Sequence, residues 1–219
     1  MPTRRIPFAW SACSLLFLFL LAGCERASSS GENEPRLPDP VGDTLQERTV
    51  LMTGTLTRDG SDALITSCDG RQTWRLRDPD SLFPVDADFV SVYATVPEGP
   101  ADPFVASRIN YVPTEGFRCE FDWEGTLWRA AGNEPFWSVI MTEDGLTVRM
   151  PAEPPRVVPF KTQPGPVFLG DGLRVAFTPG LCADTMVDTM FGWSVTLEVD
   201  NRTLTGCGFE GMAAQTRRP

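Results

Sequence analysis

Short apolar segments separated by turn residues run along the chain from Thr49 onward, and this spacing constrains the fold more than any other feature. The segments are rich in Val, Thr, Ile and aromatic residues, as expected of strands. The first five strands are predicted at 49–57, 63–68, 72–77, 88–96 and 104–112. Asp69-Gly70, between two of them, is a typical tight-hairpin sequence. Five strands in about 65 residues suit a small antiparallel barrel of the OB type.

A second series of strands is predicted after residue 122, at 126–131, 136–142, 146–150, 156–161, 173–178, 193–199 and 202–208. Glu143-Asp144-Gly145 and Asp200-Asn201 stand where hairpin turns are needed. Only 183–189 has a helical pattern, of about two turns. These segments predict a second antiparallel β-domain, either a sandwich or a barrel. The fold class is therefore mainly β, with two small antiparallel β-domains.

Composition excludes several functional classes. A hydrophobic fraction of 42% and a charged fraction of 22% are ordinary for a globular protein. The formal net charge of −10 opposes nucleic-acid binding, which needs a basic surface. Because the sequence has no histidine, it has no His-based catalytic pair and no His-ligated metal site. We therefore expect no nucleic-acid partner, no metal and no other cofactor.

The N-terminus has the features of a lipoprotein signal peptide. Arg4 and Arg5 form a basic start, and the apolar stretch 8–21 is too short to cross a bilayer of about 30 Å with ease. It ends in Leu21-Ala22-Gly23-Cys24, which resembles the bacterial lipobox. The resemblance implies that the signal peptide 1–23 is removed and that Cys24 carries acyl chains, which together form a stable membrane anchor.

The predicted mature protein begins with a polar tether, residues 24–46, which has almost nothing to bury and is expected to be disordered. An OB-like β-domain at 47–121, a C-terminal β-domain at 122–212 and a tail at 213–219 follow. The residue after the lipidated cysteine is Glu, where Asp would resemble an inner-membrane retention signal. We therefore expect a lipid-anchored protein on the periplasmic face of the bacterial outer membrane.

Four cysteines follow Cys24, and export places them in an oxidising compartment. Three pairings are possible, and pairing within each predicted domain favours Cys68–Cys119 and Cys182–Cys207. The loops that they close make each bond worth about 3–4 kcal/mol. The alternative is a four-cysteine metal site, which is disfavoured because the sequence has no Cys-x-x-Cys spacing.

Two motifs stand out in the second β-rich stretch. The first is Gly132-Asn133-Glu134-Pro135-Phe136-Trp137, in which the glycine permits a close backbone turn and the proline extends the residue before it. Phe136 and Trp137 point to opposite faces of a strand, so one can be core while the other is partly exposed. The second motif consists of Cys182, Asp184, Met186 and, further along, Gly206-Cys207-Gly208.

Together these motifs resemble the GNEPFW and C-x-D-x-M…GCG signatures of a family of uncharacterised bacterial envelope lipoproteins, over about residues 122–212. The resemblance implies a small β-domain and little specific chemistry. The preceding stretch, with Cys68-Asp69-Gly70 and Trp74-Arg75-Leu76, is similar to the OB-like domain of NlpE-type envelope-stress lipoproteins. The Cys-x-x-Cys motif of those proteins is absent here, which argues against their copper and redox-sensing roles.

These features favour a non-catalytic binding or stress-sensing role, with an envelope protein or a glycan as partner. The candidate binding residues are those of the two motifs. Phe136, Trp137 and Trp193 are potential interaction anchors, although core positions are more common for such residues.

Three alternative functions remain open. An acidic exported β-protein suits the inhibition of a basic lytic enzyme such as lysozyme. Glu134 with Asp184 or Asp188 supplies the two carboxylates of a glycan hydrolase. Met186 and Met190 offer soft ligands for Cu(I).

Overall fold

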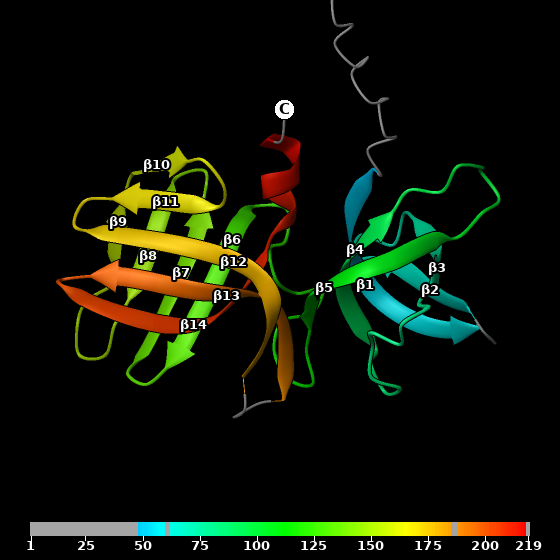
Figure 1. Cartoon of the computed structure of the whole chain (residues 1–219), viewed down its shortest axis with the longest axis horizontal. Coiled ribbons are helices and arrows are strands. Elements are labelled where there is room, and N and C mark those ends of the chain that lie inside the picture. The colour runs from blue at the N-terminus through cyan, green and yellow to red at the C-terminus, as the bar shows by residue number, and fades with distance from the viewer. Residues whose placement is uncertain (1–47, 60–61, 185–187, 218–219) are drawn as a thin grey trace, which may run out of the picture. The chain divides into compact units, whose positions relative to one another are not determined.

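Strands dominate the computed structural model, which describes residues 48–59, 62–184 and 188–217 (Figure 1). The described elements are strands except for one short 3-10 helix, η1 (Met212–Arg217). The prediction of a mainly β, antiparallel fold is confirmed. Within the described ranges, no helix has the length and apolarity needed to cross a membrane. The predicted signal peptide, Cys24, the tether and Met186 lie outside these ranges.

The first five strands close into a ring. They are β1 (Thr49–Asp59), β2 (Asp62–Ser67), β3 (Thr73–Arg77), β4 (Phe89–Thr95) and β5 (Phe104–Val112). Hydrogen-bonded neighbours follow the order β1-β2-β3-β5-β4 and return to β1, with β3–β5 parallel and the other pairs antiparallel. This closed five-stranded arrangement suits the OB-type barrel expected from the sequence. Ile65, Leu76 and Val92 are fully buried in its core.

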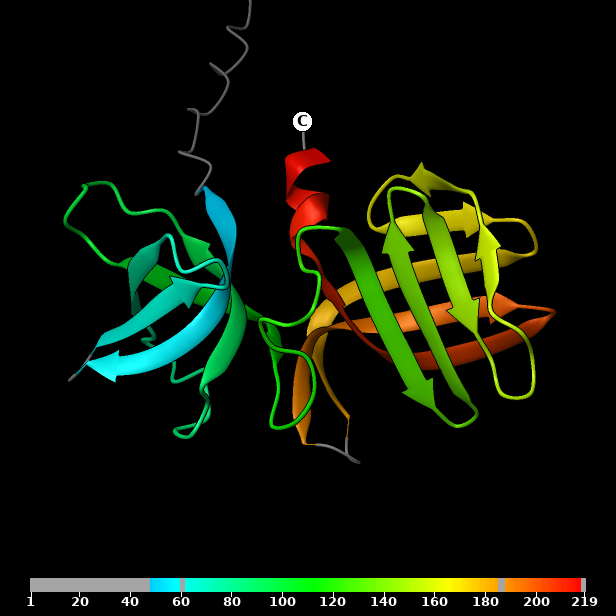
Figure 2. The same cartoon turned by 180° about the vertical axis from the view of Figure 1, so that it is seen from behind.

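The remaining strands form an up-and-down meander. They are β6 (Thr126–Asn133), β7 (Phe136–Thr142), β8 (Gly145–Arg149), β9 (Arg156–Val158), β10 (Phe160–Gln163), β11 (Val167–Gly170), β12 (Leu173–Asp184), β13 (Thr189–Val199) and β14 (Arg202–Glu210). Strands β6 to β9 pair in chain order, strands β10 to β14 do the same, and β14 pairs with β6. The result is a barrel whose two end strands are β9 and β10. Strands β12–β14 are nearer the viewer in Figure 1, and β6–β8 in Figure 2.

Buried and exposed side chains alternate along the strands of this second barrel, and the buried ones form its core. On β13, Trp193, Val195, Leu197 and Val199 are buried, whereas the alternating residues Ser194 and Glu198 are exposed and Thr196 is half-buried. Residues two apart on a strand face the same side, so the buried set points into the barrel. Each fully buried side chain of this kind contributes about 1.5–3 kcal/mol.

Strand β13 pairs with strands of both barrels. It pairs with β14 from Trp193 to Val199, and then with β5 through Met190 and Phe191. An aromatic cluster lies where β13 pairs with β5. Its buried members are Phe89, Tyr111, Trp123 and Phe209, and Phe117, Phe121 and Phe191 pack against them. The described residues belong to one compact unit. The division into separate domains at 121/122 stays a prediction.

Both predicted disulfides are confirmed. Cys68 bonds to Cys119, and Cys182 bonds to Cys207. The second bond joins β12 to β14 across β13, because both strands pair with β13. The turn predicted at Asp200-Asn201 is also confirmed: the two residues have positive φ angles of 50° and 59°, which suit a two-residue hairpin turn.

Two predictions of local structure are wrong. The helix expected at 183–189 is contradicted at both described ends, because Ala183 and Asp184 belong to β12 and Thr189 begins β13. A two-turn helix is marginal by itself, and the pairing of β13 with β12 and β5 overrides it. The strand expected at 156–161 is two strands, since Pro159 has no N–H to donate and separates them.

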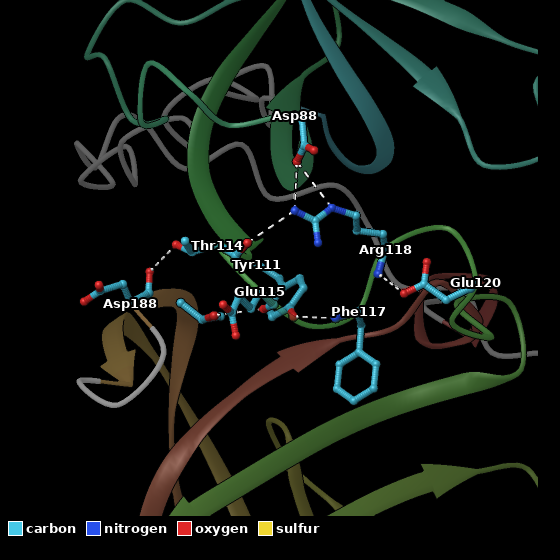
Figure 3. Close-up of polar contacts among 9 residues, drawn as sticks. Asp88, Tyr111, Thr114, Glu115, Phe117, Arg118, Glu120 and Asp188 are labelled. Atoms are coloured by element: carbon cyan, nitrogen blue, oxygen red, sulfur yellow. Dashed lines mark hydrogen bonds and ion pairs between the residues drawn. The ribbon is translucent and has the colours of Figure 1, made fainter.

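The segment between β5 and β6 is held by polar contacts (Figure 3). Arg118 donates to a carboxylate oxygen of Asp88 at 3.1 and 3.3 Å and to the carbonyl of Thr114 at 3.3 Å. The Thr114 hydroxyl donates to the carbonyl of Asp188 at 2.9 Å. The N–H of Phe117 donates to the Tyr111 hydroxyl oxygen at 3.1 Å. With Cys119 also bonded to Cys68, this segment is fixed at several points.

Candidate functional site

Glu210, the last residue of β14, is a fully buried carboxylate with 0% exposure. It lies an even number of residues from Leu204, which packs in the core of the second barrel. Residues with the same parity on a strand face the same side, so Glu210 points to the barrel interior. Gly206 and Gly208 occupy the positions between them, where a Cβ would collide with Trp137 and Phe177, respectively.

Glu210 lines a cavity of about 660 Å³ at this end of the barrel. Strands β6, β13 and β14, the β10–β11 hairpin and η1 supply its walls, with the residues Leu127, Trp128, Phe160, Thr162, Gly165, Pro166, Phe168, Trp193, Glu210 and Ala214. The volume falls within the range of about 300–1,000 Å³ common for small-molecule sites. A largely apolar wall with one carboxylate is a typical composition for such a site.

Four aromatic side chains give the cavity its shape. Trp128 and Trp193 meet edge to face with ring centroids 4.9 Å apart and an interplanar angle of 87°. Phe168 lies 6.2 Å from Trp128 and 5.7 Å from Phe160. These separations are those of favourable aromatic pairs, so neighbouring rings hold one another in place.

Asn110 of β5 organises the polar base of the site. Its amide nitrogen donates to the carbonyl of Glu210 and to the Ser91 hydroxyl, both at 2.8 Å. Its amide oxygen accepts from the N–H of Glu210 at 2.9 Å and from the indole of Trp193 at 3.2 Å. The β13–β14 ladder ends at the pair Trp193 and Gly208. The side chain of Asn110 thus takes the place of a strand partner for Glu210 just beyond that ladder.

Tyr93 of β4 completes the base. Its hydroxyl donates to the Glu210 carboxylate, and it accepts from the Trp193 indole at 3.2 Å. Burial raises the pKa of Tyr93 well above its ordinary value, and the neighbouring Glu210 carboxylate raises it further. The phenol therefore remains a proton donor to Glu210 at neutral pH.

Arg108 lies against the same aromatic residues. Its guanidinium carbon is 3.9 Å from the ring centroid of Tyr93 and 4.5 Å from that of Trp193. It also donates to the carbonyl of Gly192 at 3.0 Å. Gly192 allows this close crossing of β5 and β13, since a Cβ there would lie 2.0 Å from the carbonyl oxygen of Ile109.

The first sequence motif forms the β6–β7 hairpin. Gly132 and Asn133 end β6, Phe136 begins β7, and the Glu134–Pro135 peptide bond between them is cis. Trp137 is 1% exposed and Phe136 is 54% exposed, so the two aromatic residues do face opposite sides. The Trp137 indole donates to the carbonyl of Thr205 on β14 at 3.2 Å.

The two motifs meet around Trp137. A Cβ on Gly132 would lie 2.3 Å from its indole nitrogen, and a Cβ on Gly206 would lie 2.8 Å from its ring. The Cys182–Cys207 bond follows directly along β14. Gly132 and Gly206, one from each motif, therefore allow tight packing of one buried tryptophan, and a shallow cleft of about 170 Å³ is lined by both glycines.

Of the other residues proposed from the sequence, Trp193 lines the cavity, whereas Glu134, Asp188 and Met190 lie apart from its lining. Glu134 is exposed in the hairpin turn, and Asp184 pairs through its backbone with Thr189. Asp188 is exposed next to Thr114, and Met190 packs against the core of the first barrel. Across residues 48–59, 62–184 and 188–217, no group of three or more Cys, Asp or Glu side chains is placed to hold a metal ion.

Glu210, Asn110 and Tyr93 were not predicted as site residues. Two signals for them exist in the sequence. Asn110 interrupts the apolar run Ile109–Val112, and Glu210 lies an even number of residues from Leu204, so both face the same side of β14. Neither signal shows that the three side chains meet, because Glu210 is on β14, Asn110 on β5 and Tyr93 on β4.

Comparison of the chain with protein-family models, with curated proteins and with solved structures gives no match.

Proposed function

We propose that this protein is a lipid-anchored, non-catalytic binding protein of the bacterial cell envelope, whose second barrel takes up a small amphiphilic molecule. The observation that carries the proposal is the cavity of about 660 Å³ with aromatic walls and a buried carboxylate at its base. Closed and nearly closed barrels of this size class commonly enclose one small ligand.

The polar base favours binding over catalysis. Tyr93 donates a hydrogen bond to the Glu210 carboxylate, and Asn110 donates one to the Glu210 carbonyl. Trp193 donates a hydrogen bond to Asn110, so these groups are held rigidly. No nucleophile lines the cavity apart from the hydroxyl of Thr162 and the Glu210 carboxylate, among the residues that the structure describes. Such a preformed site lowers the ordering cost of binding.

The proposal includes a lipid anchor on Cys24 and a location at the outer membrane. The lipobox at Cys24 supports attachment to the outer membrane, and two disulfides suit the oxidising periplasm. A barrel held near a membrane by a polar tether has access to amphiphiles that leave or enter that membrane.

Native mass spectrometry of the mature lipidated protein extracted from envelopes tests the proposal. We expect one non-covalent small-molecule adduct per wild-type chain. Ala214→Trp, which fills the cavity from η1, should remove it, while Thr203→Trp at an exposed position of β14 should retain it. An adduct that persists in Ala214→Trp, or no adduct in any variant together with no binding of added amphiphiles, would refute the cavity as a binding site.

A further inference from the structure

We propose a second binding site, for a phosphate group, on the outer face of the second barrel. Its ligating groups are the guanidinium groups of Arg129 on β6 and Arg149 on β8, with the Ser138 hydroxyl of β7 between them. The site is separate from the cavity, because the flanking residues Trp128 and Val139 belong to the core inside the barrel and side chains alternate along a strand. This proposal is therefore independent of the proposed function.

Strand pairing brings the three residues together on one face. Ser138 pairs with Arg149 on β8 and with Ala131 on β6, and Arg129 is two residues from Ala131. Directly opposite residues have Cβ atoms about 4.5–5.5 Å apart, and diagonal neighbours lie about 7–8 Å apart. Long side chains span such separations, so both guanidinium groups can reach an anion placed above Ser138.

Arg129 is held against aromatic rings. Its guanidinium carbon lies 4.2 Å from the ring centroid of Phe117 and 6.0 Å from that of Phe121. A guanidinium has five N–H donors in a fixed planar fork, and an aromatic ring offers them no oxygen acceptor. The rings therefore position the Arg129 fork and leave its hydrogen-bonding capacity for another partner.

The three polar groups lack oxygen partners in the protein. Over the described part of the chain, neither arginine forms an ion pair or a side-chain hydrogen bond, and the hydroxyl of Ser138, a residue with 6% exposure, forms none either. Other arginines of the chain do find carboxylates: Arg75, Arg118 and Arg174 form ion pairs of 2.6, 3.1 and 2.9 Å. Partly buried charges are costly without a partner, so these groups are suited to a ligand from outside.

The charge around Arg129 is positive. Burial lowers the pKa of Arg129, the Tyr111 phenol opposes this shift, and repulsion from Arg149 adds to it. Two neighbouring arginines without carboxylate partners stand out in a chain whose formal net charge is −10. A bound anion removes their mutual repulsion and offsets the cost of burying the Arg129 charge.

A phosphate group matches these donors better than a carboxylate does. A phosphate monoester carries about −1.5 to −2 charges at pH 7 and three strong acceptor oxygens, whereas a carboxylate carries one charge and two oxygens. Arginine commonly binds phosphate through two parallel charge-assisted hydrogen bonds. Two sources offer such a group, a lipid with a terminal phosphate and a free phosphate ion.

Isothermal titration calorimetry tests the site on the mature lipidated protein in maltoside micelles and phosphate-free buffer, with empty micelles as the blank. The probes are inorganic phosphate, acetate, dihexanoyl phosphatidic acid and its phosphate-free counterpart dihexanoylglycerol. We expect phosphate to bind about tenfold more tightly than acetate. If phosphatidic acid binds more tightly than both phosphate and dihexanoylglycerol, and Arg129→Gln removes this preference, the source is a lipid; if phosphate binds at least as tightly, the source is the free ion. Acetate binding as tightly as phosphate, or no phosphate-dependent binding of either probe, would overturn the proposal.

Three variants locate the binding. Arg129→Gln and Arg149→Gln should each weaken phosphate binding about tenfold, because each removes charged hydrogen bonds. Arg77→Gln, which removes the same charge from an exposed position of β3, is the matched control and should change binding less than about twofold. Saturating phosphate should raise the Tm of wild type and of Arg77→Gln and leave that of Arg129→Gln unchanged.

The exposed position of Arg149 keeps the test decisive if Arg129→Gln does not fold. Wild-type affinity for phosphate in a folded Arg129→Gln or Arg149→Gln protein would overturn the proposal. An equal loss of affinity in Arg77→Gln would also overturn it, because binding would then follow net charge and not this site.

Discussion

Replacing Asn110 with alanine should destabilise the protein strongly, because this buried side chain joins β5 to the end of β14. It makes four hydrogen bonds of 2.8–3.2 Å. The Trp193 indole and the Ser91 hydroxyl keep second partners, at Tyr93 and Thr53 respectively. The main-chain N–H and C=O of Glu210 lose their Asn110 partners, at about 1–3 kcal/mol for each buried group.

The expected loss is therefore about 2–6 kcal/mol, with a central value of about 4 kcal/mol. For a folded unit of 150–250 residues this corresponds to a decrease in Tm of about 8–16 °C. Thermal unfolding of the mature protein in detergent, followed by near-ultraviolet circular dichroism, measures the change. Thr203→Ala, at an exposed position of β14, is the control and should remain within about 0.5 kcal/mol of wild type. A decrease in Tm of less than about 2 °C for Asn110→Ala would show that the Asn110 hydrogen bonds do not hold this end of β14.

Three further predictions concern the tyrosines, the disulfides and the anchor. Burial raises the pKa of both tyrosines of the chain, Tyr93 and Tyr111, so the folded protein retains phenolic protons that the unfolded chain releases. The contribution of the two phenols to the free energy of unfolding is fully present below a pH of about 10 and is lost as the pH rises above it. Tyrosinate absorbance that grows near pH 10 in the still-folded protein would contradict this. The double variant Cys182→Ser/Cys207→Ser should lose about 3–4 kcal/mol, seen as a lower Tm, since the bond closes a loop with a sequence separation of 25; an unchanged melting curve would exclude a stabilising role. Cys24→Ser should abolish incorporation of labelled palmitate, and continued labelling would disprove the lipobox assignment.

The sequence predicted the fold where local signals and tertiary pairing agree. Strand β5 was placed at its observed bounds, and the hairpin turn Asp200-Asn201 was recognised because both residues tolerate the left-handed backbone that it requires. The disulfide pairing also followed from the sequence, since each bond closes a loop within one run of strands.

Predictions failed where distant segments decide the structure. Strand β11 was missed because Pro166 directly precedes it, Gly170 ends it and its stability comes from pairing with β10 and β12. The helix expected at 183–189 was excluded by pairing of β13 with β12 and β5. Local periodicity contains no information about either set of partners.

The candidate site could not be predicted for the same reason. The motif with Trp137 was conspicuous in the sequence, yet its residues serve close packing between β6, β7 and β14. The cavity instead depends on Glu210, an ordinary acidic residue until β14 places it inside the barrel. A glutamate in a chain with net charge −10 is usually solvated, and only the three-dimensional pairing shows that this one is buried.

The most direct test of the account is a crystal structure of the protein grown with an amphiphilic probe that carries bromine at the end of its alkyl chain. The account predicts an anomalous bromine peak inside the second barrel, among the cavity residues Trp128, Phe168 and Trp193. A bromine peak only at the protein surface, or a cavity filled by ordered water at a saturating probe concentration, would contradict it.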